Sequence, residues 1–367
     1  MNTERPPFRA DHVGSLLRPE PVKQARARLA AGEIDQAELT AVEDAEIRKM
    51  IQHQEAVGLQ AVTDGECRRS FWHYDFLREL DGLKEVVGEG TIQFQGVATP
   101  SKSIRVVGKI GYSGHSHIDH FRFLKDNTSR LAKMTIPSPS MLYYRGGRSM
   151  FDDGLYSDLD TYYADLAAAY QKAVKAFYDA GCRYLQIDDT SFAYLCDPKQ
   201  RQMLIDRGDD PDALLANNIR VINESVKNRP SDMVMTMHIC RGNFRSTFIS
   251  SGGYEPVAEA LFNDVDLDGY FMEWDNERSG GFEPLRFLPK GHKRVVVGLI
   301  TSKTGALEKQ ETILRRLEEA EQYAAKDQLC LSPQCGFAST EEGNVLTEEE
   351  QWAKLRLTVE IAKAHWG

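Results

Sequence analysis

Residues 161–189 read TYYADLAAAYQKAVKAFYDAGCRYLQIDD, and this stretch decides the fold. Within residues 162–180, apolar side chains recur at intervals of three and four, which predicts an amphipathic helix. These side chains are Leu166, Ala169, Tyr170, Ala173 and Phe177. A short β-rich run follows at residues 184–188. A helix that runs into a strand is the repeating unit of folds whose parallel strands are joined by helical crossovers.

The same alternation extends along the whole chain. Strand candidates are residues 10–16, 61–66, 104–110, 133–137, 184–188, 234–240, 270–274, 295–300 and 329–333. The clearest helical patterns are residues 36–57, 162–180, 211–227, 309–325 and 347–364. This order predicts an α/β fold, a TIM (β/α)8 barrel. The candidates exceed the places in such a barrel by one, so either residues 10–16 or residues 104–110 are expected to lie outside it.

Length and composition agree with a single domain. The chain has 367 residues, of which 41% are hydrophobic and 27% charged, enough for one barrel with insertions. The stretch at residues 70–109 does not fit one crossover, because aromatic FWHYDFL is followed by the β-rich runs TIQFQGV and SIRVVGKI. A β-hairpin insertion at about residues 70–103 is the simplest interpretation. Without a repeat or a compositional boundary, residues 1–367 are predicted to form one catalytic domain.

Charge and cysteine content narrow the partners and the compartment. The net charge of −10 argues against nucleic acid and acidic membranes as main partners, which leaves a small molecule. The N-terminal MNTERPPFRADHVGS lacks the pattern of an export signal, and no apolar run reaches the length of a membrane span. The six cysteines are sparse, as in proteins of the reducing cytoplasm. Helices on the outside of the barrel could pair with those of a second copy, so a homo-oligomer stays one of the open alternatives.

A metal site is predicted at the ends of three strands. In MHICRGN, His238 and Cys240 are two residues apart on a strand, so both side chains leave the same face. Glu273 in GYFMEWD and Cys335 in LSPQCGF follow at the ends of later strands, which open on one rim of a TIM barrel. One nitrogen, two sulfurs and one oxygen suit Zn²⁺, which lowers the pKa of a thiol substrate. The alternative is that both cysteines are core residues and Glu273 is a surface carboxylate.

Several motifs resemble one enzyme family. ADHVGSLLRP, VTDGE, QIDD, MHIC and PQCGF occur in the order found in the catalytic barrel of cobalamin-independent methionine synthases, in particular their short single-barrel relatives. The resemblance implies zinc on the same four residues and transfer of a methyl group to the thiol of homocysteine. It also implies that Val13, Gly14, Ser15, Glu66 and Asp188 bind the amino-acid part of homocysteine.

That implied binding site is physically reasonable. Carboxylates match the ammonium group of homocysteine, whereas backbone N–H groups and a hydroxyl match its carboxylate. Helix capping or a solvated position is an equally good interpretation of Glu66 and Asp188 taken alone. Tyr144, with Tyr143, falls near the place of a pterin-stacking tryptophan of the family, although packing explains it as well.

The sequence departs from the family at the catalytic acid and the methyl donor. The family has a histidine after the strand that here reads VGLITSK, where this chain has Thr301. His12 and His73 are the nearest replacements by motif, His73 within an aromatic stretch that could form a lid, and a structural role is the alternative for each. The chain is too short for the family's second, folate-binding barrel. The donor is therefore left open between a methylated folate, a corrinoid carried by a partner protein, and a small sulfonium or thioether.

Two other functions remain at this point. Relatives with the same metal motif join coenzyme M to epoxides, but a sulfonate thiol would prefer basic residues to Glu66 and Asp188. A protein that binds zinc and homocysteine without turnover is the second alternative, because the family histidine is missing at Thr301.

Overall fold

The computed structural model describes residues 5–94 and 97–367. Its centre is a curled, all-parallel sheet of seven strands in the order β1-β4-β5-β6-β7-β8-β9. These strands are β1 (Ala61–Val62), β4 (Leu131–Pro137), β5 (Tyr184–Asp189), β6 (Val234–Ile239), β7 (Gly269–Glu273), β8 (Arg294–Ile300) and β9 (Leu329–Pro333). Neighbours in the sheet follow each other along the chain from β4 onward, as expected for strands joined by helical crossovers.

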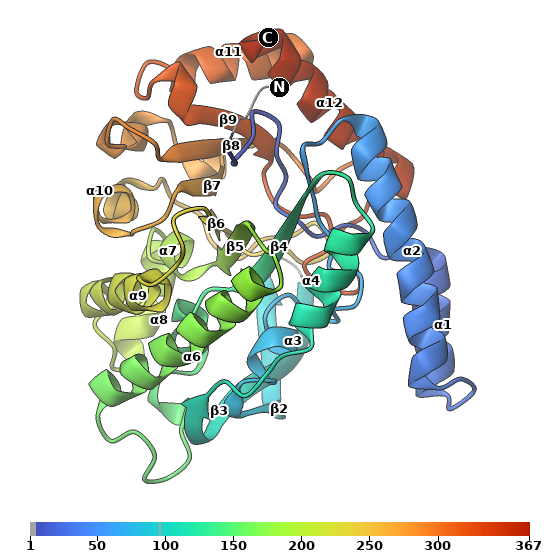
Figure 1. The fold of residues 1–367 in the computed structure, drawn as a ribbon. Coiled ribbons are helices and arrows are strands. Elements are labelled where there is room, and N and C mark those ends of the chain that lie inside the picture. The colour runs from blue at the N-terminus through green and yellow to red at the C-terminus, as the bar shows by residue number, and fades with distance from the viewer. Residues whose placement is uncertain (1–4, 95–96) are drawn as a thin grey trace.

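Helices surround the sheet. They are α1 (Glu20–Ala30), α2 (Gln36–Val57), α3 (Tyr74–Leu77), α4 (His117–Asp126), α5 (Ser140–Gly146), α6 (Leu159–Asp179), α7 (Ser191–Tyr194), α8 (Pro198–Asp206), α9 (Pro211–Val226), α10 (Glu255–Asp264), α11 (Gln310–Ala320) and α12 (Glu348–Trp366). Helices α6, α9, α10, α11 and α12 follow the outer side of the sheet, whereas α1 projects at one side (Figure 1). In the described part of the chain, no helix combines the length and apolar character needed to cross a bilayer.

An irregular segment lies between the two ends of the sheet. The backbone N–H of Asp11 donates to Leu331 of β9 at 3.0 Å, and the N–H of Leu16 donates to Gly65, just after β1, at 2.9 Å. The arrangement is consistent with a TIM-like barrel. The predicted strand at residues 10–16 is therefore this segment, which has a single parallel bridge from Ala10 to Leu331. Residues 104–110, the other doubtful candidate, lie outside the parallel sheet.

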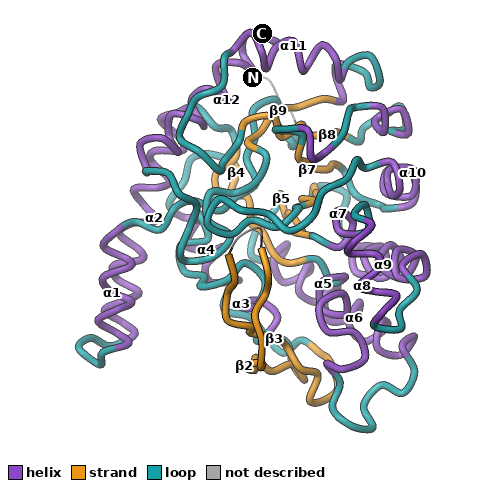
Figure 2. Tube along the Cα trace, turned by 180° about the vertical axis from the view of Figure 1, so that it is seen from behind, coloured by secondary structure: helices purple, strands orange, loops and turns teal. Residues whose placement is uncertain are grey.

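Those residues belong to an antiparallel ribbon instead. Strand β2 (Asp81–Phe94) pairs with β3 (Val97–Gly111), and the pairing continues to Asp81 opposite Gly111, beyond the predicted limit at residue 103. Figure 2 shows this ribbon as two orange strands set apart from the parallel sheet. Gln95 and Gly96, in the predicted run TIQFQGV, lie outside the described residues.

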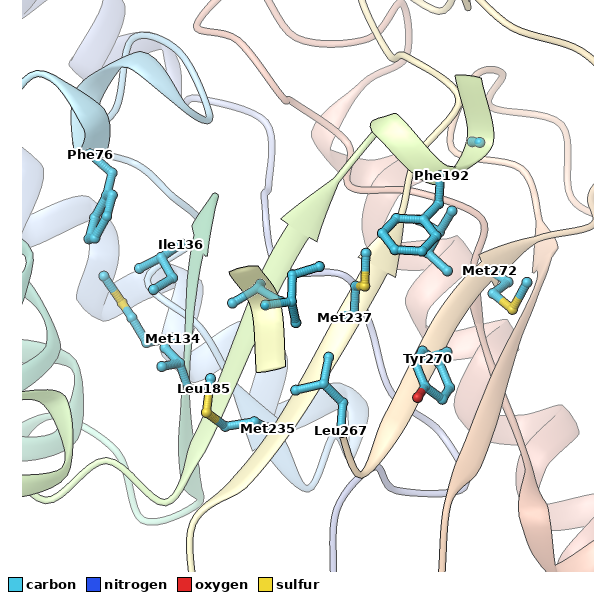
Figure 3. Packing of buried hydrophobic residues seen from close by; sticks show 14 of the residues in the cluster. Phe76, Met134, Ile136, Leu185, Phe192, Met235, Met237, Leu267, Tyr270 and Met272 are labelled. Carbon is cyan, nitrogen blue, oxygen red and sulfur yellow. The ribbon is translucent and has the colours of Figure 1, made fainter. Parts of the chain in front are cut away.

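Alternation along each parallel strand separates two regions of the core. In β5, Leu185 and Ile187 belong to the large apolar cluster beneath the helices, whereas Tyr184 belongs to a small cluster with Phe8. Figure 3 shows Leu185 with Met235, Met237 and Met272 of the neighbouring strands in the large cluster. Successive side chains of a strand point to opposite faces, so Asp188 lies on the same face as Tyr184. That inner face carries the polar residues discussed below.

A buried ion pair fastens the irregular segment to the inner face. Lys133 of β4 lies 3.3 Å from Asp11, and both side chains are fully buried. The second carboxylate oxygen of Asp11 accepts hydrogen bonds from Tyr184 at 2.9 Å and from the N–H of Phe8 at 3.1 Å. We therefore infer that Asp11 positions the following residues, Val13–Gly14–Ser15, at the mouth of the inner face.

Replacing Asp11 with asparagine is expected to destabilise the protein by about 3–5 kcal/mol, because it leaves the Lys133 ammonium buried without its counter-charge. Urea unfolding with a fixed m-value measures the change. Adding Lys133→Met to this variant removes the stranded charge and should restore much of the stability. If Asp11→Asn alone leaves the urea midpoint of unfolding unchanged, the ion pair between Asp11 and Lys133 does not hold this segment.

Candidate metal centre and active site

The four candidate metal ligands meet on the inner face of the sheet. His238 lies in β6 and Cys240 directly after it, Glu273 ends β7, and Cys335 follows β9. One ligand atom from each residue lies within 4.8 Å of every other. All four side chains are buried. The structure thus brings together all four residues that strand alternation and strand-end position suggested, as a group that could hold a metal ion.

Distances within the group suit a tetrahedral ion. The Sγ of Cys335 lies 3.4 Å from Nε2 of His238 and 3.6 Å from Sγ of Cys240. Ligand atoms about 2.0–2.3 Å from a tetrahedrally bound zinc are separated from one another by roughly 3.3–3.8 Å. The donor types, two thiols, one imidazole and one carboxylate, also favour zinc over magnesium or calcium.

Neighbouring groups hold the candidate ligands in place. The Nδ1 of His238 lies 3.3 Å from the carbonyl oxygen of Phe271, which leaves Nε2 directed at Cys335. One oxygen of Glu273 accepts the N–H of Arg241 at 2.6 Å, and the other accepts a hydrogen bond from Arg278 at 2.6 Å. Burial acts to raise the pKa of Glu273, but the charge of Arg278 and other cations outweighs it and holds that pKa below the ordinary value.

The electrostatics of the group favour a thiolate at Cys335. A hydrogen bond from Cys240 holds the pKa of Cys335 well below its usual range, and the same contact raises the pKa of Cys240. Burial acts to lower the pKa of His238, but the negative charge at Cys335 outweighs it and raises that pKa to about 9. A metal ion bound here would displace the His238 proton, because only the neutral imidazole binds a metal.

A cavity adjoins this cluster. The space within it that a water molecule can enter is about 30 Å³, so the cavity is narrow. It is lined by Val13, Ser15, Glu66, Phe71, Trp72, Arg145, Asp188, Thr190, Tyr194, His238, Cys240, Gly242, Asn243, Cys335, Gly336, Ser339 and Thr340. Three of the four candidate ligands therefore face the same space as most of the candidate substrate-binding residues.

Two carboxyl groups stand together in the cavity. The Oε1 of Glu66 accepts a hydrogen bond from Thr135 at 2.8 Å, and the Oδ1 of Asp188 accepts one from Gln186 at 2.7 Å. The Oε2 of Glu66 is buried without a hydrogen-bond partner among the described residues. Burial, and then the charge of Glu66, raise the pKa of Asp188 to about 7. Such a pair is suited to a ligand that brings a positive charge.

Val13, Gly14 and Ser15 pass along one wall. Val13 and Ser15 line the cavity, whereas Gly14 turns away with its carbonyl accepting a hydrogen bond from Thr63 at 2.6 Å. Gly14 has a φ of 141°, and a Cβ there would lie 2.8 Å from Thr135. A Cβ on Gly336 of the PQCGF motif would lie 1.9 Å from Oγ of Ser15. The VGS and PQCGF motifs therefore require glycine where they pass each other.

Comparison with known proteins identifies the family. The family described as "Cobalamin-independent synthase, Catalytic domain" matches residues 8–364. The chain belongs to the cobalamin-independent methionine synthase family. It is 51% identical to Uncharacterized protein YxjH of Bacillus subtilis, over 98% of this chain and 95% of that protein. It is 24% identical to the methionine synthase of Pyrococcus abyssi, over 89% of this chain and 85% of that protein.

A solved structure extends the likeness to the whole fold. The crystal structure of a candidate vitamin-B12 independent methionine synthase from Listeria monocytogenes matches with a TM-score of 0.82 and 44% identity, covering 100% of both chains. The resemblance seen in the sequence motifs is thereby confirmed for the cobalamin-independent methionine synthase family.

Besides Gly14 and Glu273, four residues suggested by the sequence do not line the cavity: His12, His73, Tyr144 and Thr301. Burial, with the nearby Lys133, lowers the pKa of His12 to about 4. Burial and Arg145 hold the pKa of His73 well below its usual range. Both imidazoles are thus neutral near pH 7. Their catalytic roles stay predictions.

Tyr144 and Thr301 each contact a neighbouring residue of the fold. Tyr144 is buried beside Tyr194, with 5.5 Å between the ring centroids. The N–H of Thr301 donates to Glu308 at 2.9 Å. Stacking and proton transfer by these residues remain expectations.

Several cavity residues were not suggested by the sequence. Asn243 follows the MHIC motif, and its side chain donates to the carbonyl of Gly336 at 2.9 Å and accepts from Lys303 at 3.1 Å. Arg145 and Tyr194 come from α5 and α7, short helices without a recognisable motif. The polar CRGN and TSK endings could have indicated Asn243 and Lys303, because both follow strands of the sheet.

Proposed function

We propose that the chain is a zinc-dependent S-methyltransferase that methylates homocysteine to methionine on a single (β/α)8 barrel domain. One observation carries the proposal: three of the four candidate metal ligands line the same cavity as the acidic pair Glu66 and Asp188. The metal group suits a thiol, and Glu66 with Asp188 suits an ammonium group. Homocysteine contains both, joined by a short carbon chain.

The chain's own residues would bind and orient the amino acid. Glu66 and Asp188 would accept hydrogen bonds from its ammonium group, which replaces part of the hydration lost on burial. Ser15 would offer its backbone N–H and hydroxyl to the carboxylate. His238, Cys240, Glu273 and Cys335 would hold zinc. Zinc supplies Lewis acidity, which lowers the pKa of a thiol toward neutral pH.

Methyl transfer would then be an in-line nucleophilic displacement at the methyl carbon of the donor. A lone pair of the homocysteine thiolate forms the new S–C bond, while the bond between the methyl carbon and the donor breaks and leaves its electrons on the donor. The thiol gives up one proton. A neutral donor such as a methylated folate takes up one proton as it leaves, whereas a sulfonium leaves as a neutral thioether and the proton passes to solvent. Held in a fixed orientation, the two reactants avoid much of the entropic cost of meeting in solution.

A second candidate is transfer to a sulfonate thiol of the coenzyme M type. Arg145, which the sequence did not suggest, supplies the cation that a sulfonate requires. Glu66 and Asp188 would be left facing an anion in this case. The acidic pair therefore favours homocysteine, and the Asp188 variant in the Discussion separates the two.

Zinc X-ray absorption on the zinc-loaded protein tests the proposal. With four protein donors the spectrum should show two sulfur neighbours, from Cys240 and Cys335. Adding homocysteine is expected to add a third sulfur, and methyl iodide should then yield methionine in the protein-bound fraction faster than in buffer. A spectrum that does not change with saturating homocysteine would refute the proposed activation of the thiol.

A further inference from the structure

One cation in the cavity has no role in the binding of homocysteine as proposed above. Arg145 lines the cavity, and its Nε is buried without a hydrogen-bond partner in the described part of the chain. Its guanidinium lies 5.6 Å from the centroid of the Tyr194 ring, so an aromatic face rather than a carboxylate supports it. Arg145 is half-buried, and a partly desolvated guanidinium without an anion is well placed to bind one from a ligand.

Two other arginines near the site have carboxylate partners, whereas Arg241, which lies over the Tyr254 ring, does not line the cavity. Arg278 lies 2.6 Å from Glu273 and 3.0 Å from Asp275. Arg69 lies 3.5 Å from Glu66. For Arg145, no carboxylate within ion-pair distance is found among the side chains of residues 5–86 and 102–367. The cationic charge of Arg145 therefore remains available to a molecule in the cavity.

Arg145 lies beside Tyr194 and the aromatic stretch FWHYDFL. Its charge acts on the pKa values of Tyr194, Tyr74 and His73. Arg145 thus belongs to the wall built by the aromatic stretch FWHYDFL. Phe71 and Trp72 of that stretch also line the cavity and offer apolar surface.

We propose that Arg145 binds an anionic group of the methyl donor, and that the donor is therefore a molecule that carries a carboxylate, phosphate or sulfonate apart from its methyl group. This inference rests on the proposed function, because it assigns the acidic pair to homocysteine. A guanidinium binds such oxyanions through paired hydrogen bonds and repels a sulfonium that lacks an acidic group. The departing group keeps its acidic function through the transfer, so Arg145 orients the donor without taking part in bond exchange.

Alkylating agents that differ only in charge test this role without knowledge of the donor. The pairs are iodoacetate with iodoacetamide, and 4-iodobutyrate with 4-iodobutyramide. Mass spectrometry measures alkylated homocysteine formed on the zinc-loaded protein, and free homocysteine in buffer gives the intrinsic ratio for each pair. Wild type is expected to favour the acid over the amide by about tenfold or more beyond this intrinsic ratio in at least one pair, as for a charged hydrogen bond.

Variants connect that preference to Arg145. Arg145→Gln should lower the rate with the acid relative to the rate with the amide until their ratio equals the intrinsic one, and Arg145→Lys should keep part of the preference. Arg148→Gln removes the same charge from an exposed arginine that donates to the carbonyl of Tyr156, and should keep the preference in full. Circular dichroism confirms that each variant is folded.

Three outcomes would overturn the inference. Wild type with no preference for the acids would show that Arg145 does not bind anions at this site. Equal losses with acid and amide in Arg145→Gln would indicate a structural role. Calorimetric binding of homocysteine that weakens in Arg145→Gln would assign the arginine to the acceptor. If wild type fails to bind homocysteine at all, the proposed function fails as well, and this result is distinct from the other three.

Discussion

Replacing Cys335 with alanine is expected to lower zinc affinity by more than about 100-fold and to abolish alkylation of homocysteine on the protein. The loss should be this large because even a group that only supports a metal ligand is worth about 10–100-fold in affinity. Cys335 also lies at the centre of the cluster, in contact with both His238 and Cys240. Elemental analysis after dialysis, together with competition against a chelator, measures the effect.

The control for this variant is Cys182→Ala. Cys182 is equally buried, but its thiol donates to the carbonyl of Tyr184 at the start of β5, at the opposite end of the strand from Asp188. The same atoms are removed, so any general cost of truncating a buried cysteine appears in both variants. Full zinc content in Cys335→Ala would contradict the ligand set. Zinc loss in both variants would instead point to a disturbed fold.

Much of this site could be predicted because strands obey a simple geometry. Alternation places His238 and Cys240 on one face, and parallel strands open on one rim, so residues far apart in sequence meet there. The four candidate ligands needed only these two rules. The strand at residues 10–16 was assigned by composition alone, and the structure instead holds this segment by the contacts of Asp11 and by single backbone hydrogen bonds.

Arg145 shows where sequence reasoning fails. It lies in α5, a helix of 7 residues whose placement depends on packing against distant parts of the chain. A charged residue in such a helix is usually solvated, and nothing in the spacing distinguishes Arg145 from Arg148. Only the position of the guanidinium beside Tyr194 and the cavity shows the difference. The predicted insertion ended at about residue 103, whereas the pairing of β2 with β3 reaches Gly111. The register of two strands depends on contacts between them, which the spacing of residues along one chain does not show.

The acidic pair allows the sharpest test of the acceptor. Asp188 is buried next to Glu66, and its pKa is raised to about 7, so a cation that enters the cavity would ionise it and relieve the repulsion between the carboxylates. Homocysteine brings such a cation in its ammonium group, whereas coenzyme M brings only a sulfonate. The two acceptors therefore respond to the charge of Asp188 in opposite directions.

Asp188→Asn is expected to weaken homocysteine binding by roughly 10- to 100-fold, the range for loss of a charged hydrogen bond in a buried site, and to leave coenzyme M binding equal or tighter. Isothermal titration of the zinc-loaded protein with each thiol measures both affinities at pH 7.5. The control is Asp209→Asn, a carboxylate that accepts a hydrogen bond from Tyr143 and does not line the cavity. Equal losses for the two thiols would remove the assignment of Asp188 to the ammonium group.

Stability provides an independent check on the same variant. The pKa of Asp188 lies above its ordinary value in the folded protein, so ionisation opposes folding: the cost begins as pH rises above the unfolded-state pKa and is complete above pH 7. Asparagine has nearly the same shape and cannot ionise, so Asp188→Asn should melt at the same or a higher temperature than wild type at pH 8, with a smaller difference at pH 5. A variant that binds homocysteine poorly but is at least as stable would have lost a binding group, because a structural carboxylate would lose stability on the same change.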